Sequence, residues 1–566
     1  MRLVTRPIVL TAALVVAAIA APVAQQRTEP AARPQAVAQA TASPSLFVII
    51  SIDQMRGDYV TRYGHQWTRG LRRLIDGGAR FTRTVYPYFN TVTCAGHATI
   101  GTGTFPGTHG MVLNQWFDRT ANSTTNCTDD ATVTPFVYGE GPAPAKSNSG
   151  ARLLVPTFAD EMRAQASPAP RVAAVSLKAR SAIGLAGHGG DVVLWHDGGR
   201  FMSSTAFSPA RTPFVDEYTT KHPIRADFGK TWTKSLPDAA YLFEEEGLGE
   251  KLAGRTQSFP YQMTGRNNAV DASFYTSWEY SPLADEYVGA LAMESVRALK
   301  LGQEAPRRDV LAVSFSVLDL IGHAYGPRSH EVQDVLVRLD ATIGRLLETL
   351  DAQVGRGRYV VGLTGDHGVS PIPEQMSALG IDAGRISLPA VRTAVDQALV
   401  PFFGDGKYVA SVLYTDLYFL PGVWDRLRAA PEAMTAVLDA IRGVAGVSAV
   451  YRSDELEARR GSGDPVATAM AVGFFAGRSG DILIAPRSYW ISSTSVATHG
   501  TMYEYDARVP LIFYGAPFAP GEYTGAATPA DLVKTLAHVA GITLPRADGR
   551  VRGEALVSQI PVPAGR

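Results

Sequence analysis

Short runs of apolar residues alternate along the chain with amphipathic stretches. Residues 331–355 place apolar side chains three and four positions apart, a spacing that predicts a long amphipathic helix. Near the C-terminus, the apolar segment 508–515 is followed by a second helical pattern over residues 529–542. Continuous apolar runs of four to eight residues are typical of parallel strands buried on both faces, and they occupy residues 46–53, 171–176, 310–316 and 359–366. The order predicts an α/β fold with a central, mostly parallel sheet flanked by helices.

Two long intervals interrupt this order. Residues 116–300 and 372–490 are rich in Gly, Pro, Tyr and short strand patterns. We expect them to be insertions that leave the strand ends and form a cap beside the site. The main domain is predicted to span residues 46–545, followed by a C-terminal tail over 546–566.

The N-terminus has the features of an export signal. A positively charged start precedes an apolar run over residues 8–21, which is too short to span a bilayer, and small residues between Ala20 and Ala24 offer cleavage sites. We predict a signal peptide over 1–24 and a Pro/Ala/Gln linker over 25–45. The alternative is an uncleaved membrane anchor. The prediction places the mature protein in the periplasm or the medium, free of the membrane.

The charge balance limits the classes of partner that the chain can attract, and the cysteine count limits the disulfides that it can form. The 566 residues are 46% apolar and 19% charged, and 53 basic residues balance 53 acidic ones. No overall field favours a nucleic acid duplex, so attraction for an anion must come from a local cluster. The only two cysteines, Cys94 and Cys127, could pair after export, or Cys94 could be a small buried side chain. The sequence gives no indication of oligomeric state.

Aspartates and histidines follow the predicted strands. In open α/β sheets, binding sites collect at the carboxyl ends of the strands. Each residue has a structural alternative: Asp53 could cap a helix, Asp319 and His323 could form a surface pair, and the Asp366-His367 dipeptide could belong to a polar loop. Together they predict metal binding, because carboxylate and imidazole both suit zinc and six ligands suit two ions. The six candidates are Asp53, Asp319, His323, Asp366, His367 and His499.

These motifs resemble those of a known family. Asp53, "NTVTCAGHATIGTG" (90–103), "DLIGH", "GDHG" and "THG" occur in the order seen in the alkaline phosphatase superfamily. The resemblance is to its type I phosphodiesterase/nucleotide pyrophosphatase group and, within it, to the phosphate-irrepressible bacterial alkaline phosphatases. It covers residues 46–545 and implies an alkaline phosphatase-like catalytic domain. It also implies one metal on Asp53, Asp366 and His367 and a second on Asp319, His323 and His499, with zinc expected and other divalent transition metals possible.

The same resemblance assigns the nucleophile to Thr93, which would also contact a metal. The residues that follow it begin like a helix, so its hydroxyl would lie at a helix N-terminus, where an anion is favoured. Metal coordination is one way to activate such a hydroxyl. We expect His97 to be a structural hydrogen-bonding residue and Thr91 to serve the local turn.

Three further residues bear on the substrate. Asn114 matches the phosphate-contacting Asn of the family, and the Lys178/Arg180 pair resembles the one that monoesterases place on the phosphate. The alternative for the Lys178/Arg180 pair is a solvated basic loop. The resemblance implies an exported alkaline phosphatase that hydrolyses small phosphate monoesters through a phosphothreonine. The alternatives are a nucleotide pyrophosphatase/phosphodiesterase with the same metals and a non-enzymatic metal- or phosphate-binding protein. A sulfatase is excluded because Cys94 lacks the C-x-P-x-R context.

Overall fold

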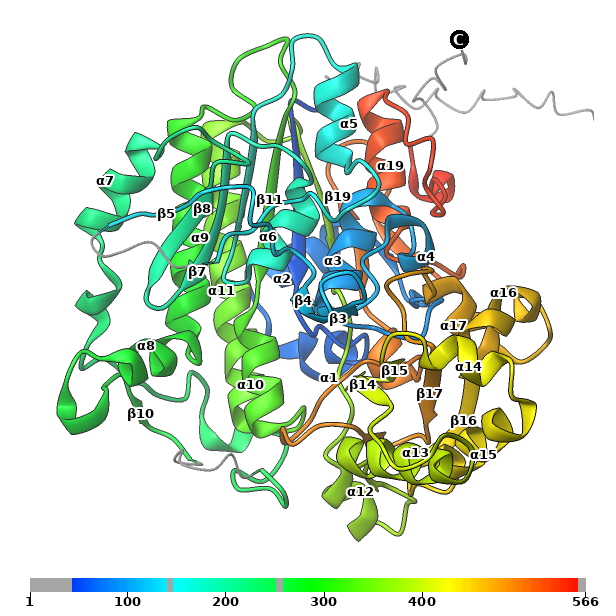
Figure 1. Ribbon diagram of the computed structural model, residues 1–566. Helices are drawn as coiled ribbons and strands as arrows, with labels where there is room; N and C mark the ends of the chain where they lie inside the picture. Colours follow the sequence, from blue (N-terminus) through cyan, green and yellow to red (C-terminus); the bar gives the residue numbers. More distant parts are fainter. Residues whose placement is uncertain (1–42, 140–145, 251–257, 558–566) are drawn as a thin grey trace, which may run out of the picture. The chain divides into compact units, whose positions relative to one another are not determined.

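A computed structural model describes residues 43–139, 146–250 and 258–557 (Figure 1). The predicted signal peptide and residues 25–42 of the linker lie outside the described residues. The first strand begins at Leu46, where the sequence predicts the folded domain to start. None of the helices in the described part of the chain combines the length and apolarity that crossing a membrane requires.

The described residues contain a sheet of ten strands in the order β20-β2-β19-β12-β1-β11-β6-β7-β8-β5. The five central strands, from β12 to β7, are mutually parallel, and the outer pairs β12/β19, β19/β2, β7/β8 and β8/β5 are antiparallel. The mostly parallel α/β sheet predicted from the apolar runs is therefore confirmed. The strands are β1 (Leu46–Ile52), β2 (Ala79–Phe81), β5 (Pro135–Val137), β6 (Val172–Ser176), β7 (Val192–Asp197), β8 (Arg200–Ser204), β11 (Asp309–Phe315), β12 (Tyr359–Thr364), β19 (Leu511–Tyr514) and β20 (Gly521–Tyr523).

Helices cover both faces of this sheet, which explains why its strands are apolar throughout. Val48 and Ile50 of β1 face one buried cluster, whereas Phe47 and Ile49 face another. The first cluster is covered by α2 (Gly70–Gly77), α9 (Pro282–Ala298), α10 (Val317–Tyr325) and α11 (His330–Gln353). The second is covered by α3 (Thr93–Thr102), α5 (Phe158–Gln165), α6 (Ala179–Ala186) and α19 (Asp531–Ala540).

Helix α3 lies unusually close to its neighbours because it carries glycines at the contacts. A Cβ atom at Gly101 would lie 2.1 Å from the Gly184 carbonyl oxygen of α6. One at Gly96 would lie 2.2 Å from the carbonyl oxygen of Asp366, just past the end of β12. Both distances are far shorter than any real carbon–oxygen contact, so these positions require glycine. The first turns of α3 are thereby held against the carboxyl edge of the sheet.

The interval 116–300 is not one insertion. Strands β6, β7 and β8 and helices α6 and α9 all fall inside it, yet they belong to the main sheet and its helical layers. The hairpin of β3 (Gln115–Asp118) and β4 (Ser123–Asn126) is a separate two-stranded sheet.

Most of the interval 372–490 forms a small lobe with a core of its own (lime green to orange in Figure 1). Its antiparallel sheet has the order β14-β15-β17-β16 and packs with the lobe's helices around buried residues such as Leu417 and Val437. The lobe's elements are α13 (Leu388–Phe403), β14 (Val409–Leu413), β15 (Asp416–Phe419), α14 (Val423–Arg428), α15 (Pro431–Arg442), β16 (Val447–Arg452), α17 (Pro465–Gly473) and β17 (Ile482–Pro486).

The described part of the expected C-terminal tail packs onto the domain. Arg552 is 2% exposed and its guanidinium forms an ion pair with Asp531 at the start of α19. Phe518 and Leu556 form a further antiparallel bridge. Residues 546–557 are therefore part of the folded unit.

Candidate active site

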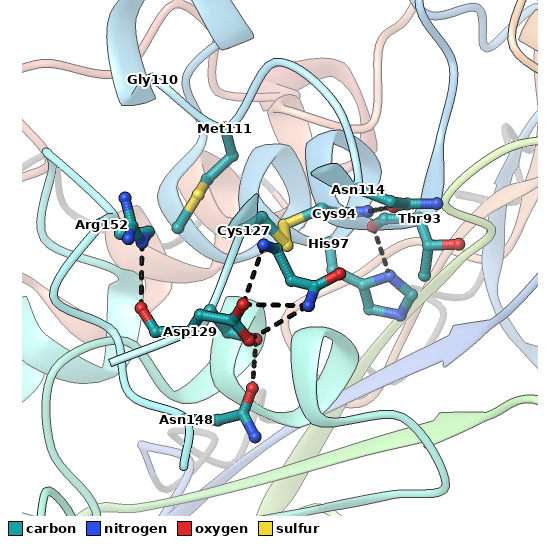
Figure 2. The surroundings of a disulfide bond; sticks show 12 residues. Thr93, Cys94, His97, Gly110, Met111, Asn114, Cys127, Asp129, Asn148 and Arg152 are labelled. Carbon is teal, nitrogen blue, oxygen red and sulfur yellow. Dashed lines mark hydrogen bonds between the residues drawn. A yellow bond between two sulfur atoms is a disulfide. The ribbon is translucent and has the colours of Figure 1, made fainter. Parts of the chain in front are cut away.

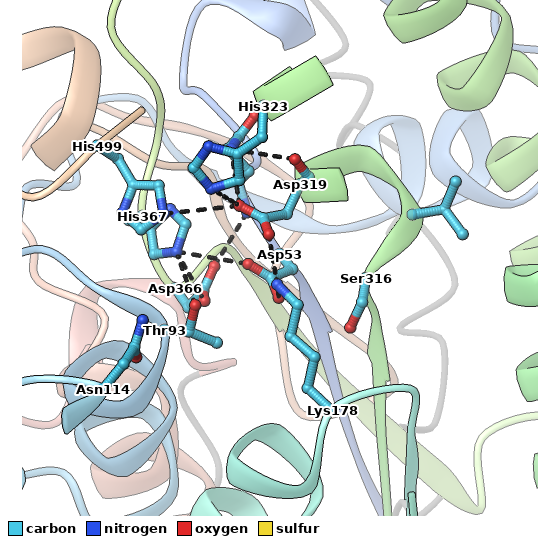
Figure 3. A network of polar contacts seen from close by, with 12 residues as sticks. Asp53, Thr93, Asn114, Lys178, Ser316, Asp319, His323, Asp366, His367 and His499 are labelled. Atoms are coloured by element: carbon cyan, nitrogen blue, oxygen red, sulfur yellow. Dashed lines mark hydrogen bonds and ion pairs between the residues drawn. The ribbon is translucent and has the colours of Figure 1, made fainter. Parts of the chain in front are cut away.

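The predicted metal ligands meet at the carboxyl edge of the parallel strands (Figure 3). Asp53 directly follows β1, Asp319 lies in the first turn of α10 after β11, and Asp366 follows β12. All three carboxylates are buried, with exposed fractions of 0%, 3% and 0%. Because β12, β1 and β11 are neighbours in the sheet, their ends bring together residues as distant in the chain as Asp53 and Asp366.

Asp53, Asp366 and His367 form one compact group whose ligand atoms lie within 4.8 Å of one another. The Nε2 atom of His367 is 3.2 Å from Asp366 Oδ2 and 3.4 Å from Asp53 Oδ1. Asp53 Oδ1 and Asp366 Oδ2 are buried oxygens without a hydrogen-bond donor. This is the first of the two predicted ligand sets.

The second group differs in one member from the predicted set. Asp319 and His499 cluster with His367 within the same 4.8 Å limit, whereas His323 does not belong to that cluster. His323 Nε2 nevertheless lies 3.2 Å from Asp319 Oδ1, and His499 Nε2 lies 3.6 Å from the same oxygen. The Nδ1 atoms of His323 and His499 contact the carbonyl oxygens of Ala497 and Thr91 at 2.8 Å. These contacts direct both Nε2 atoms toward Asp319.

The electrostatics of the cluster fit a bound cation. Burial, reinforced by the Asp366 carboxylate, raises the pKa of Asp53 to about 7. Burial opposes protonation of His367, but Asp366 outweighs it and raises the pKa of His367 to about 9. Burial and the nearby His367 lower the pKa of His499 well below its usual value. Divalent metals stabilise ionised carboxylates and neutral imidazoles together, so the donor set and its two oxygens without a hydrogen-bond donor suit such ions.

Lys178 extends from the end of β6 into the same cluster. Its ammonium group donates to Asp53 Oδ2 at 2.5 Å and also to Asp319 Oδ2. Although burial alone would lower it, the Asp319 and Asp53 carboxylates raise the pKa of Lys178. Lys178 is therefore a charged member of the site, and the alternative of a solvated basic loop is wrong for this residue.

Thr93 is the first residue of α3 and is 1% exposed. Its hydroxyl oxygen lies 3.4 Å from His367 Nε2, so it adjoins the first ligand group. His97, one turn later, contacts the Thr93 carbonyl oxygen through Nδ1 at 2.9 Å and Ser314 Oγ through Nε2 at 2.8 Å. The expected structural role of His97 agrees with these bonds. Thr91 does not serve a local turn, because its hydroxyl donates to the distant Thr501 carbonyl at 2.7 Å.

Asn114 is fixed beside Thr93 by a disulfide and by hydrogen bonds from two backbone N–H groups (Figure 2). Cys94 and Cys127 are joined by a disulfide, which decides between the two sequence alternatives. The Cys94 N–H donates to Asn114 Oδ1 at 2.8 Å, and the Cys127 N–H donates to the Asn114 carbonyl at 3.0 Å. The bridge and the two bonds form a closed ring that links Asn114 to the start of α3.

A cleft of about 430 Å³ opens over the cluster. Thr93, Asn114, Lys178 and Arg180 line it together with Asp319, His323 and His499. The Nε atom of Arg180 is buried without a hydrogen-bond acceptor. All three predicted substrate-contacting residues therefore face one cleft with the predicted nucleophile.

Two residues of the site have no signal in the sequence. Gln54, at a positive φ of 68°, donates from Nε2 to Asp319 Oδ1 at 2.7 Å and from its backbone to Asp366 Oδ1 at 3.0 Å. Tyr414, from the lobe, lines the cleft and accepts a bond from Asn114 at 3.1 Å. Neither lies in a recognisable motif, and their partners are distant in the sequence.

The comparison with known families identifies the class of protein. Residues 47–502 match the family described as type I phosphodiesterase / nucleotide pyrophosphatase, and the chain belongs to that family. Among curated relatives, alkaline phosphatase PhoK of Sphingomonas sp. is 31% identical over 539 residues, which are 90% of this chain and 91% of that protein. Alkaline phosphatase PafA of Elizabethkingia meningoseptica is 27% identical over 515 residues, which are 89% and 92% of the two chains.

Solved structures give the same result. The crystal structure of wild-type PafA superimposes with a TM-score of 0.83 at 27% identity and covers 91% of this chain and 99% of that one. The predicted alkaline phosphatase-like fold is thereby confirmed. An inactive murine ectonucleotide pyrophosphatase / phosphodiesterase 5 shares the fold at a TM-score of 0.52 and 15% identity.

Proposed function

We propose that this chain is an exported alkaline phosphatase that hydrolyses small phosphate monoesters through a phosphothreonine on Thr93. The observation that carries the proposal is the convergence of Thr93, two groups of buried Asp and His ligands and the Lys178/Arg180 pair on one cleft. The names of the curated relatives point in the same direction. Export follows from the N-terminal sequence pattern.

Two zinc ions are the proposed cofactors. Asp53, Asp366 and His367 would hold one, with Thr93 beside it, and Asp319, His323 and His499 would hold the other. Bound metals of this kind lower the pKa of a coordinated hydroxyl and stabilise the charge of a leaving oxygen. His323 enters the second set because its Nε2 atom already faces Asp319.

The residues of the chain then perform the reaction in two displacements. The Thr93 oxygen loses its proton to solvent and attacks phosphorus, the bond to the ester oxygen breaks, and the departing alkoxide takes up a proton. Water next attacks the phosphothreonine, which releases inorganic phosphate and restores the hydroxyl. The N-terminus of α3 favours the anion that Thr93 carries between the two steps.

Substrate class follows from the groups that face the non-bridging oxygens. A monoester dianion presents oxygens that a diester has covered with a second ester group. Arg180 can bind two phosphate oxygens at once, and Lys178 contributes a point charge. In a phosphodiesterase these charges would face an ester group, so the pair favours monoesters over the nucleotide pyrophosphatase/phosphodiesterase alternative.

The experiment compares kcat/KM for p-nitrophenyl phosphate and bis-p-nitrophenyl phosphate, using the zinc-loaded protein. Thr93→Ala should abolish both activities, and Thr93→Ser should retain part of them. Thr102→Ala is the matched control, since this buried threonine of α3 only donates to the Ala98 carbonyl and contacts Thr104. A preference for the diester would assign the chain to the phosphodiesterase alternative. Full turnover by Thr93→Ala would refute the nucleophile, and phosphate binding without turnover would indicate a binding protein.

A further inference from the structure

The tip of the β14–β15 hairpin places a tyrosine in an unusual backbone conformation. Leu413 pairs with Asp416, so Tyr414 and Thr415 form a two-residue turn. Tyr414 has a φ of 55°, in the left-handed region. Turns of this length favour glycine or asparagine at such a position, and a bulky aromatic residue there is an outlier. Strained residues of this kind cluster at functional sites.

The same turn is attached to the segment that carries Thr93. The Thr415 hydroxyl donates to Asn90 Oδ1 at 2.6 Å, and Asn90 Nδ2 donates to Asp416 Oδ1 at 3.3 Å. Asn90 lies three residues before Thr93. The contacts with Asn90 therefore hold the hairpin tip over the cleft. The position of Tyr414 depends on these contacts as well as on the packing of the lobe.

The Cys94 N–H and the Tyr414 hydroxyl together hold the Asn114 amide in one orientation. Asn114 Oδ1 accepts from the Cys94 N–H at 2.8 Å, and Asn114 Nδ2 donates to Tyr414 Oη at 3.1 Å. An amide with its oxygen bonded to one partner and its nitrogen to another has one orientation. Within the described residues, the second N–H of this amide has no acceptor in the protein. That N–H is left for a ligand in the cleft.

We infer that Tyr414 is a positioning residue, which holds the Asn114 amide so that its remaining N–H donates to a phosphoryl oxygen. The role rests on the proposed function, because it assumes that phosphate occupies the cleft beside Thr93. It gives the lobe a defined part in the site: the hairpin orients a residue that belongs to the main domain.

A double-mutant cycle tests the inference. Affinity for inorganic phosphate is measured by calorimetry on the zinc-loaded protein, and kcat/KM is measured with p-nitrophenyl phosphate. The four proteins are wild type, Tyr414→Phe, Asn114→Ala and the double variant. Tyr414→Phe keeps the ring and removes one neutral hydrogen bond, so we expect both quantities to fall about five- to tenfold. In the Asn114→Ala background the same change should have no further effect.

Equal effects of Tyr414→Phe in both backgrounds, or no effect in the wild type, would overturn the inference. Tyr503→Phe is the matched control, because that hydroxyl donates to the Pro486 carbonyl at 2.8 Å and neither residue lines the cleft. Tyr414→Gly provides a second variant that suits the turn, and it should lose as much phosphate affinity as Tyr414→Phe. Calorimetry measures phosphate binding without turnover. An active Thr93→Ala variant would therefore refute the proposed nucleophile, while the phosphate affinities of the four proteins would still test the role of Tyr414.

Discussion

The parallel strands and the hairpin of the lobe contribute to the site in different ways. Ionisable side chains lie within four residues of the carboxyl ends of strands β1, β11, β12 and β6: Asp53, Asp319, Asp366 and Lys178. The β14–β15 hairpin supplies the hydroxyls of Tyr414 and Thr415 and the carboxylate of Asp416, and these contact Asn90 and Asn114, not the metal-ligand cluster. The sheet therefore carries the ionisable residues of the proposed metal site, and the lobe orients residues beside that site. Substitutions in the two regions should therefore differ in how strongly they lower kcat/KM and in whether they change the zinc content.

The strongest test of this difference compares two buried aspartates. Asp53→Asn removes a ligand of the proposed first metal, and loss of several kcal/mol of metal stabilisation should lower kcat/KM by about 10³-fold. Asp416 in β15 is equally buried, but it accepts from the Gly480 N–H at 2.7 Å and from Asn90. Asp416→Asn should retain the full zinc content. The zinc content and kcat/KM of both variants are measured. Loss of zinc in Asp416→Asn would show that the lobe, like the sheet edge, is needed for metal binding.

A second test compares two cations. Lys178→Ala should lower kcat/KM for the monoester about 10- to 100-fold, the size of a hydrogen bond to a charged group, and should affect the diester less. Arg392→Ala in α13 is the control, because its guanidinium donates only to the carbonyls of Val409 and Ala410 in the lobe. The ratio of the two activities in each variant is the measurement. An unchanged ratio in Lys178→Ala would mean that its charge serves the carboxylates alone.

The disulfide should matter more for folding than for turnover. It closes a loop with a sequence separation of 33, and the double variant Cys94→Ala/Cys127→Ala should lose about 3–4 kcal/mol of unfolding free energy on the chain-entropy model. The hydrogen bonds from the backbone N–H groups of residues 94 and 127 to Asn114 can still form in this variant. We therefore expect kcat/KM to fall only a few-fold. Urea titration and kinetics with p-nitrophenyl phosphate measure the two effects. A loss of turnover as large as that of Lys178→Ala would show that the bridge itself positions Thr93.

The smallest expected effect concerns pH and stability. Burial raises the pKa of Asp416 to about 6, above the value of about 3.9 for an unfolded chain. The folded protein therefore binds more protons between these values, and this group costs stability as the pH rises from about 4 to about 6. The unfolding free energy of Asp416→Asn, relative to wild type, should rise across that window by up to about 3 kcal/mol. Denaturation at several pH values tests this, and a flat difference would contradict it.

The sequence was sufficient for the sheet and for the ligands at its edge. Buried parallel strands are apolar on both faces, and Asp53 and Asp366 follow such strands directly, so both the element and the polar residue at its end were visible in the sequence. The interval 116–300 was harder to interpret, because short strands of the main sheet, such as β7 and β8, share it with the separate β3/β4 hairpin. Tyr414 was invisible for a different reason. Its role depends on a turn conformation and on a partner 300 positions away.

The glycine at position 96 has a consequence for how this chain can change by substitution. Helix α3 touches the backbone of Asp366 at that point, with no room for a side chain. The spacing between the residue that opens the helix and the loop after β12 is therefore set by main-chain contact alone. Evolution, or a laboratory library, can exchange the side chains around that spacing and so alter which ligands the cleft accepts. It cannot widen the spacing in small steps, because the first step, any other residue at Gly96, already separates the two halves of the site.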